Sequence, residues 1–258
     1  MKMKTLIVDD NTLNLKVAQR IVEQEGLEVD TANSGFECLD MVKQNQYDII
    51  FMDIMMPEMD GVETLKKLKE IENFNTPVVT LTADAKVGSE EKYLNEGFNA
   101  YLTKPIIKEK LDEVLNSLLS ADKKETVKDT ETKKDSQDGA TKGNIEYLKA
   151  NDIDVDVSIE LLGDIEMYNQ TLKDFIEESK SRIPRIIKNK MSRNMKDYSI
   201  DVHAMKSDSK YLGFKKLAEL SYEHEIKSKE EDSNFVTLHF DELIDEYERI
   251  SEIMKKYL

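Results

Sequence analysis

The segment "YDIIFMD", residues 47–53, decides the fold of the first half of this chain. Between its two aspartates stand four large apolar residues, Ile49, Ile50, Phe51 and Met52. Successive side chains of a strand point to opposite faces, so a run that is apolar at every position predicts a strand covered on both faces. The segment therefore predicts a central strand of a parallel sheet that has helices on both sides.

The alternation of strand-like and helical patterns extends to both sides of this segment. Further strand-like segments stand at residues 5–8, 27–32, 76–83 and 100–103. Helical periodicity covers residues 12–25, 35–45, 61–71, 88–97 and 106–119. Five strand–helix units in this order predict an α/β, doubly wound, five-stranded parallel sheet.

Residues 120–143 separate this region from the rest of the chain. The segment "SADKKETVKDTETKKDSQDGATKG" almost lacks apolar side chains and mixes both signs of charge. Such a composition cannot bury enough surface to fold alone, and it indicates a flexible linker. We therefore expect two domains, at residues 1–119 and 144–258.

The second half has helical patterns and no convincing strand. Helical periodicity covers about residues 165–191, 198–210, 215–229 and 238–256, and a short helix is expected near residues 145–149. Residues 234–240 remain ambiguous between strand and helix, and Pro184 is expected to kink or divide the first long helix. Four main helices of this length predict an antiparallel four-helix bundle.

Charge and cysteine content limit the function classes. The formal net charge is -16, which repels nucleic acid and anionic membranes, and the second half has no basic recognition helix. The single cysteine excludes a disulfide framework within the chain. No apolar run reaches the length of a signal peptide core or of a membrane span. We expect a cytoplasmic protein that binds neither DNA nor membranes.

Polar side chains stand where the predicted strands end, and these are Asp9, Asp10, Asp53, Thr82 and Lys104. In a doubly wound sheet, functional groups collect beyond the carboxyl ends of the strands. Three carboxylates there would repel one another and favour a hard divalent cation such as Mg²⁺, which takes oxygen ligands. The lysine and the threonine could then hold a phosphoryl group against one carboxylate.

Each of these features has a structural alternative when taken alone. An Asp-Asp pair after a strand is also common as a helix N-cap, and Lys-Pro before a helix is common at a boundary. Asp53 before "IMMPEMDG" could serve loop conformation. The combination at successive strand ends favours a site.

Four segments in order, "LIVDDN", "FMDIMMPEMDG", "TLTADA" and "YLTKP", resemble the receiver domain of response regulators over about residues 1–119. The resemblance implies a flavodoxin-like fold with strand order 2-1-3-4-5. It also implies that Asp53 is the phosphoacceptor. Asp9 and Asp10 match the acidic pair that organises Mg²⁺ together with Asp53 and the backbone carbonyl of Met55.

Three more residues match positions of that family. Thr82 corresponds to the switch hydroxyl, and Lys104 corresponds to the phosphate-binding lysine, whose bond to Pro105 is often cis. Tyr101 matches the aromatic switch position. The structural alternative for Tyr101 is a strand residue that covers a neighbouring helix.

His203 lies in the helical pattern at residues 198–210. On a helical wheel the apolar stripe contains Tyr198, Val202, Met205, Ser209 and Leu212, whereas His203 shares its face with Ser199, Lys206, Ser207 and Lys210. This placement predicts an exposed imidazole. Neighbouring ammonium groups disfavour a metal site and favour an anion such as a phosphoryl group.

The segment "HAMKSDSKYLGF", residues 203–214, resembles the signature of histidine phosphotransfer (HPt) domains, and the resemblance covers about residues 144–258. It implies that His203 carries a phosphoryl group and that Lys206 stabilises its charge. Ser207 departs from the family, where glycine is usual. The other two histidines, His224 and His239, fit structural or surface positions better, and the methionines at 52, 55, 56 and 59 fit packing and loop positions.

Together these features predict a phosphorelay protein that takes a phosphoryl group on Asp53 with Mg²⁺ and uses His203 as a second carrier. Neither a P-loop nor a Gly-rich lid occurs, so a separate histidine kinase is the expected donor, with other receiver or HPt proteins as partners. A contact between the two domains, within one chain or in a dimer, is also expected. The chain is expected to be either the tail of a larger hybrid kinase or a complete protein, which the initial Met favours. In the alternative function, Asp53 gates an interaction module whose helical domain is only a docking surface or phosphate sink.

Overall fold

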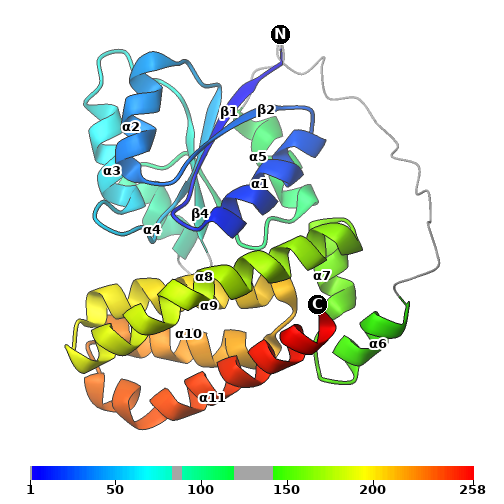
Figure 1. Cartoon of the computed structure of the whole chain (residues 1–258). Helices are drawn as coiled ribbons and strands as arrows, with labels where there is room; N and C mark the ends of the chain where they lie inside the picture. Colours follow the sequence, from blue (N-terminus) through cyan, green and yellow to red (C-terminus); the bar gives the residue numbers. More distant parts are fainter. Residues whose placement is uncertain (1, 83–88, 119–141) are drawn as a thin grey trace. The chain divides into compact units, whose positions relative to one another are not determined.

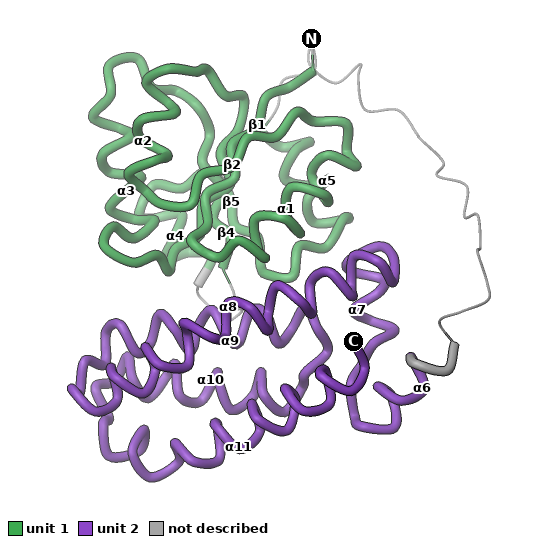
Figure 2. The backbone as a smooth tube through the Cα atoms, viewed as in Figure 1, with its two compact units in different colours: residues 1–131 green, residues 132–258 purple. Residues whose placement is uncertain are grey.

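The computed structural model describes residues 2–82, 89–118 and 142–258. The chain divides into two compact units, Met1–Glu131 and Thr132–Leu258 (Figure 2). Most of the predicted linker, residues 120–143, lies outside the described residues, and helix α6 begins at Lys142.

A five-stranded parallel sheet forms the centre of unit 1. Its strands are β1 (Lys4–Val8), β2 (Glu28–Ala32), β3 (Ile49–Asp53), β4 (Val78–Thr82) and β5 (Ala100–Thr103). Their order in the sheet is β2-β1-β3-β4-β5, and every neighbouring pair is parallel. The predicted sheet and the strand order implied by the family resemblance are therefore confirmed.

Helices cover both faces of this sheet, as Figure 1 shows. They are α1 (Thr12–Gln24), α2 (Gly35–Gln44), α3 (Gly61–Lys69), α4 (Ser89–Glu96) and α5 (Lys108–Leu118). One core cluster joins α1 and α5 to Ile49 and Phe51, whereas the other joins α2, α3 and α4 to Ile50 and Met52. The apolar run at residues 49–52 thus supplies alternate side chains to the two cores, as its composition predicts.

Unit 2 is helical throughout its described part. Its helices are α6 (Lys142–Lys149), α7 (Val155–Leu162), α8 (Ile165–Met191), α9 (Met195–Leu212), α10 (Lys215–Lys229) and α11 (Ser233–Tyr257). Helix α9 contacts α7, α8 and α10, and α11 contacts α6, α8 and α10. The central position of α9 determines the surroundings of His203.

Three details of unit 2 differ from the sequence patterns. Residues 234–240, ambiguous in the sequence, belong to helix α11. Helix α8 is not divided, because Pro184 lies inside one continuous helix. Helix α7 was not predicted, since its short pattern has too few turns to show a clear period.

Gly213 allows α9 to end against a neighbouring segment. Its backbone is left-handed, with φ +75°, and a Cβ at this position would lie 2.5 Å from the carbonyl oxygen of Asp154. Only glycine adopts this conformation without strain and leaves that space open. The packing of α9 against the start of α7 therefore explains the glycine that follows Leu212.

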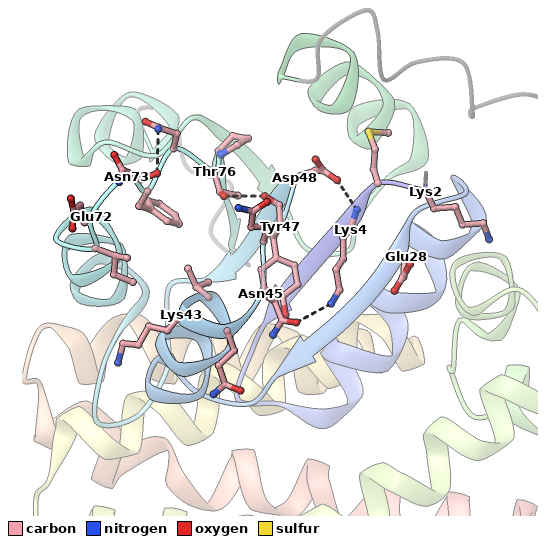
Figure 3. Close-up of a pocket in the computed structure, with 18 residues that line it drawn as sticks. Lys2, Lys4, Glu28, Lys43, Asn45, Tyr47, Asp48, Glu72, Asn73 and Thr76 are labelled. Atoms are coloured by element: carbon pink, nitrogen blue, oxygen red, sulfur yellow. Dashed lines mark hydrogen bonds between the residues drawn. The ribbon is translucent and has the colours of Figure 1, made fainter.

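A broad cleft of about 1480 Å³ opens in unit 1 at the amino-terminal ends of the strands (Figure 3). Lys4 begins β1 there, and its backbone amide donates to the Asp48 carboxylate at 2.8 Å. Thr76 donates from its hydroxyl to the carbonyl oxygen of Tyr47 at 2.9 Å. The site residues predicted in unit 1 lie at the carboxyl ends of the strands, so this cleft and the predicted site are at opposite ends of the sheet.

None of the helices in the described part of the chain combines the length and the hydropathy that a bilayer-spanning segment requires.

Candidate functional site

Three carboxylates meet at the carboxyl ends of two neighbouring strands. Asp9 and Asp10 directly follow β1, and Asp53 is the last residue of β3, which pairs with β1. One carboxylate oxygen from each residue lies within 4.8 Å of the other two. The spacing suits a single oxygen-liganded cation, so the three residues fit the Mg²⁺ that the sequence predicts.

Lys104 supplies a positive charge to this cluster from the end of β5. Its ammonium group lies 3.0 Å from an Asp53 carboxylate oxygen and also pairs with Asp9. The side chain is buried, and the peptide bond between Lys104 and Pro105 is cis. The lysine thus joins the carboxylates of two strands.

The Asp-Asp pair does not cap helix α1. The N-cap is Asn11, whose side-chain oxygen accepts from the backbone amides of Leu13 and Asn14. Asp9 instead accepts from the Asn14 side-chain amide and from the Asn11 backbone amide, each at 3.0 Å. The structural alternative for Asp9 and Asp10 is therefore wrong, and both carboxylates stay with the cluster.

Burial and mutual repulsion raise the pKa values of the acidic pair. Burial is the larger cause for both residues, and it raises the pKa of Asp9 to about 6, with the Lys104 charge opposing it. For Asp10, burial and then the charges of Asp9 and Asp53 raise the pKa to about 8. A bound cation would reverse this effect, because it favours the ionised form of each carboxyl group.

The loop after β3 holds the Asp53 side chain in place. The backbone amide of Ile54 donates to Asp53 Oδ1 at 2.8 Å. Gly61 closes the loop against the strand, where a Cβ would lie only 2.2 Å from the carbonyl oxygen of Asp53. Met55 lies in this loop, two residues beyond the strand, and is half-buried.

Thr82 lies on β4 and Tyr101 lies on β5, the two strands that follow β3 in the sheet. Thr82 is the buried last residue of β4, and its carbonyl oxygen accepts from the Lys104 backbone amide at 2.7 Å. Tyr101, on β5, is half-buried and stacks on Tyr93 of α4, with ring centroids 6.1 Å apart. Tyr101 therefore does cover helix α4, as its structural alternative predicts.

His203 is not exposed, which corrects the prediction from the helical wheel. Its exposed fraction is 3%, and Ser199, Lys206 and Ser207 on the same face of α9 are also buried. A wheel describes one helix alone, whereas α9 has neighbouring helices on several sides. Glu225 of helix α10 is one residue near His203 that a wheel of α9 alone could not include.

Glu225, from helix α10, forms a hydrogen bond with His203. Its carboxylate lies 2.8 Å from His203 Nδ1, pairs with the Lys206 ammonium group, and lies 2.5 Å from the Lys229 ammonium group. An ionised carboxylate only accepts hydrogen bonds, so Nδ1 carries the proton and the lone pair of the ring lies on Nε2. The predicted excess of ammonium groups near His203 is thus partly neutralised.

Opposing effects act on the pKa of the Glu225 carboxyl. Burial by itself would raise it, but the hydrogen bond from His203 and the nearby positive charges hold it far below its usual range. Burial lowers the pKa of the Lys206 ammonium group, and the Glu225 charge opposes this. Glu225 therefore stays ionised at neutral pH.

Sequence reasoning missed Glu225, although the helix contained a signal. Leu217, Ser221 and Glu225 stand four residues apart, and all three are buried in α10. A charged residue in line with a core-facing leucine of the same helix indicates a buried polar contact, since charges are seldom buried without partners. The pattern could have predicted a paired carboxylate, but not its partner.

The remaining histidines have structural contacts. His224 is buried, and its Nδ1 lies 2.7 Å from the Tyr198 hydroxyl, while burial lowers its pKa to about 4. His239 stacks on Phe235, with ring centroids 4.3 Å apart. Met52 and Met56 belong to the core on the α2 side of the sheet. These residues fit the structural roles expected from the sequence.

Comparisons with known proteins relate unit 1 to one family. A family model described as the response regulator receiver domain matches residues 5–116. The polar-differentiation response regulator DivK of Brucella ovis is 38% identical over 120 residues, which cover 46% of this chain and 98% of DivK.

Two solved structures are also similar. The receiver domain of the sensor histidine kinase PA1611 from Pseudomonas aeruginosa, solved with a magnesium ion coordinated in its active site cleft, is 29% identical. The match covers 46% of this chain and 98% of that one, with a TM-score of 0.42. The receiver domain of Saccharomyces cerevisiae Ssk1, solved with the histidine phosphotransfer protein Ypd1, is 26% identical and covers 45% of this chain and 88% of that one, with a TM-score of 0.42. Through residues 5–116, the chain belongs to the response regulator receiver family.

Proposed function

We propose that this chain is a phosphorelay protein in which Asp53 accepts a phosphoryl group and His203 is a second carrier. The observation that supports this most strongly is the cluster of Asp9, Asp10 and Asp53 within 4.8 Å, with Lys104 paired to Asp53. Receiver domains take part in two-component signalling, and we propose a separate histidine kinase as donor. Other receiver or HPt proteins would be further partners.

At Asp53, a carboxylate oxygen attacks the phosphorus of a phosphohistidine. The new O–P bond forms as the N–P bond breaks, and the electron pair returns to the leaving imidazole nitrogen. A magnesium ion bound by Asp9, Asp10, Asp53 and the Met55 carbonyl would neutralise charge on the phosphoryl oxygens. Lys104 holds one of those oxygens, so the contribution of the chain is mainly positioning and charge neutralisation.

The proposed output of unit 1 is a change on the surface formed by α4, β5 and α5. The Thr82 hydroxyl would turn toward the phosphoryl group on Asp53, and Tyr101 would leave its present contact with Tyr93. The stacking of Tyr101 on α4 supports this link, because movement of one ring would alter the packing of that helix.

For unit 2 we propose an HPt domain built on a four-helix bundle of α8, α9, α10 and α11. The lone pair of His203 Nε2 attacks the phosphorus of an aspartyl phosphate, the P–O bond breaks, and its electron pair stays on the aspartate carboxylate. The proton remains on Nδ1, so the product is a phosphorylated imidazolium beside the Glu225 carboxylate. The hydrogen bond between Nδ1 and Glu225 supports this role, since it both orients the ring and stabilises the charge.

One observation favours the second candidate, a phosphorylation-gated interaction module. His203 is only 3% exposed, whereas a phosphoryl donor must reach Nε2. Transfer at His203 therefore requires that this nitrogen become uncovered. If it does not, the helical unit serves as a docking surface and Asp53 remains the single acceptor.

The test uses the full chain, a small-molecule phosphodonor and Mg²⁺. We expect an acid-stable, base-labile phosphoryl label that is lost in Asp53→Ala, and an acid-labile label that is lost in His203→Gln. Complete labelling of the Asp53→Ala variant at acid-stable sites would contradict the role of Asp53. An acid-stable label without any acid-labile label would select the interaction module.

A further inference from the structure

The buried serine one turn after His203 has an unused hydroxyl group. Ser207 lies four residues beyond His203 on α9, and it is 1% exposed. Side chains four residues apart share one face of a helix, and the Cβ of the later residue leans toward the earlier one. Ser207 therefore lies on the face of α9 that carries the imidazole.

Ser207 differs in its hydrogen bonding from the other serines of the same helix. Ser199 donates to the Lys196 carbonyl oxygen and Ser209 donates to the Met205 carbonyl oxygen, both at 2.7 Å. Among the residues that the structure describes, the buried Ser207 hydroxyl oxygen has no hydrogen-bond partner. An unsatisfied buried hydroxyl is costly and uncommon, and it can donate to a ligand oxygen without breaking a hydrogen bond within the chain.

We infer that the Ser207 hydroxyl binds a phosphoryl oxygen of phosphorylated His203 and thereby speeds transfer to this residue. The inference rests on the proposed role of His203. The hydroxyl donates its proton as a hydrogen bond and is not itself phosphorylated, so the bonds formed and broken are those of the transfer to Nε2. Lys206 already donates to the Glu225 carboxylate. The Ser207 hydroxyl would be a further hydrogen-bond donor to the phosphoryl group, on the face of α9 that carries the imidazole.

The alternative for Ser207 is a steric one. Its side chain would hinder a donor from approaching His203, and a smaller residue would then speed transfer. The two explanations predict opposite effects of removing the hydroxyl, so kinetics can separate them.

The experiment measures transfer between two full-length variants. The donor is His203→Gln, phosphorylated on Asp53 and freed from the small-molecule phosphodonor, and the acceptor carries Asp53→Ala. We expect the additional change Ser207→Ala in the acceptor to slow formation of the acid-labile label about 10-fold, the usual scale for a hydrogen bond to a charged group. Ser207→Thr keeps the hydroxyl and should restore most of the rate.

A structural control separates this role from packing. Ser207→Ala removes an unsatisfied hydroxyl and introduces a better helix former, so its Tm should equal or exceed that of the parent acceptor. Ser199→Ala, one turn before His203, should leave the transfer rate unchanged, because its hydroxyl is already bonded.

Three results would overturn the inference. The first is an unchanged transfer rate in Ser207→Ala, and the second is a faster rate in Ser207→Gly. The third is a slower rate in Ser207→Ala that Ser207→Thr does not restore and that accompanies a lower Tm. Absence of acid-labile label from the parent acceptor would instead remove the proposed role of His203, and the inference with it.

Discussion

The two candidate sites surround their acceptor groups with opposite excesses of charge. At Asp53, three carboxylates share one buried ammonium group, that of Lys104. At His203, one buried carboxylate, that of Glu225, contacts two ammonium groups. The first site has one ammonium group for three carboxylates until a cation binds, whereas the second has its balancing charges within the chain.

This difference matches the chemistry of the two acceptors that we propose. A carboxylate must approach an anionic phosphoryl group, so its site requires a divalent cation and a lysine to offset repulsion. A neutral imidazole has no such repulsion to overcome, but it becomes cationic when Nε2 is phosphorylated. A fixed carboxylate on Nδ1 stabilises that product. The predictions below test this contrast, in order of decreasing expected effect.

Lys104→Met should have the largest effect. Loss of the ammonium group removes the phosphoryl-oxygen contact that we propose and leaves Asp9 and Asp53 without their shared partner. The rate of Asp53 phosphorylation by a small-molecule donor should fall roughly 100- to 1000-fold. Lys108→Met is the matched control, since Lys108 is an exposed residue paired with Glu25. Rates within a few-fold of each other for the two variants would contradict the role of Lys104.

Without Mg²⁺, the two units should respond to pH in opposite directions. His224 has a pKa of about 4, below the ordinary value of 6.5, so the stability that it contributes is present above pH 6.5 and lost as pH falls toward 4. The loss is at most about 3 kcal/mol. Asp9 and Asp10 have raised pKa values, so their contribution is present at low pH and lost as pH rises through about 6 and 8.

Hydrogen exchange of the full chain at pH 5 and pH 8 measures both responses at once. Lowering the pH should increase protection of the sheet in unit 1 and decrease protection of α9 and α10 in unit 2. His224→Asn should remove the acid sensitivity of unit 2. A change of the same sign in both units would show that other groups dominate.

Glu225→Gln should slow transfer to His203 about 10-fold. The glutamine oxygen can still accept from Nδ1, but it carries no charge to stabilise the phosphorylated imidazolium. Glu246→Gln is the control, because Glu246 is also buried in unit 2 and pairs with Arg249 and Lys216. If both variants transferred at the parent rate, charge on Glu225 would have no part in the chemistry.

Much of the fold and of the acidic site could be predicted from sequence. Strand periodicity and the apolar run around Phe51 determine a sheet that is buried on both faces, and parallel strands bring their final residues together. The site at His203 could not be predicted in the same way. Glu225 comes from another helix, 22 residues away, and no property of α9 alone reveals it. Helix α7 was too short to recognise, and the ambiguous segment at residues 234–240 became helical through its place in α11.

Asp10→Asn should have the smallest effect of this series. Without Mg²⁺ at pH 8, removal of one repelling carboxylate should raise the free energy of unfolding by roughly 1–2 kcal/mol. In the parent chain, Mg²⁺ should raise Tm more at pH 8 than at pH 6, because cation binding requires ionised carboxylates. Calorimetry checks both effects. Equal Mg²⁺ stabilisation of the parent and the variant would exclude Asp10 from the cation site.

The central claim is that both acceptors belong to one relay, and transfer between two single variants tests it most directly. His203→Gln is phosphorylated on Asp53, freed from the small-molecule phosphodonor and mixed with Asp53→Ala in the presence of Mg²⁺, and intact masses are followed with time. The account predicts that the phosphoryl group leaves the first variant and appears on the second as an acid-labile adduct. Release of the group only as inorganic phosphate, with the second variant unmodified, would contradict it.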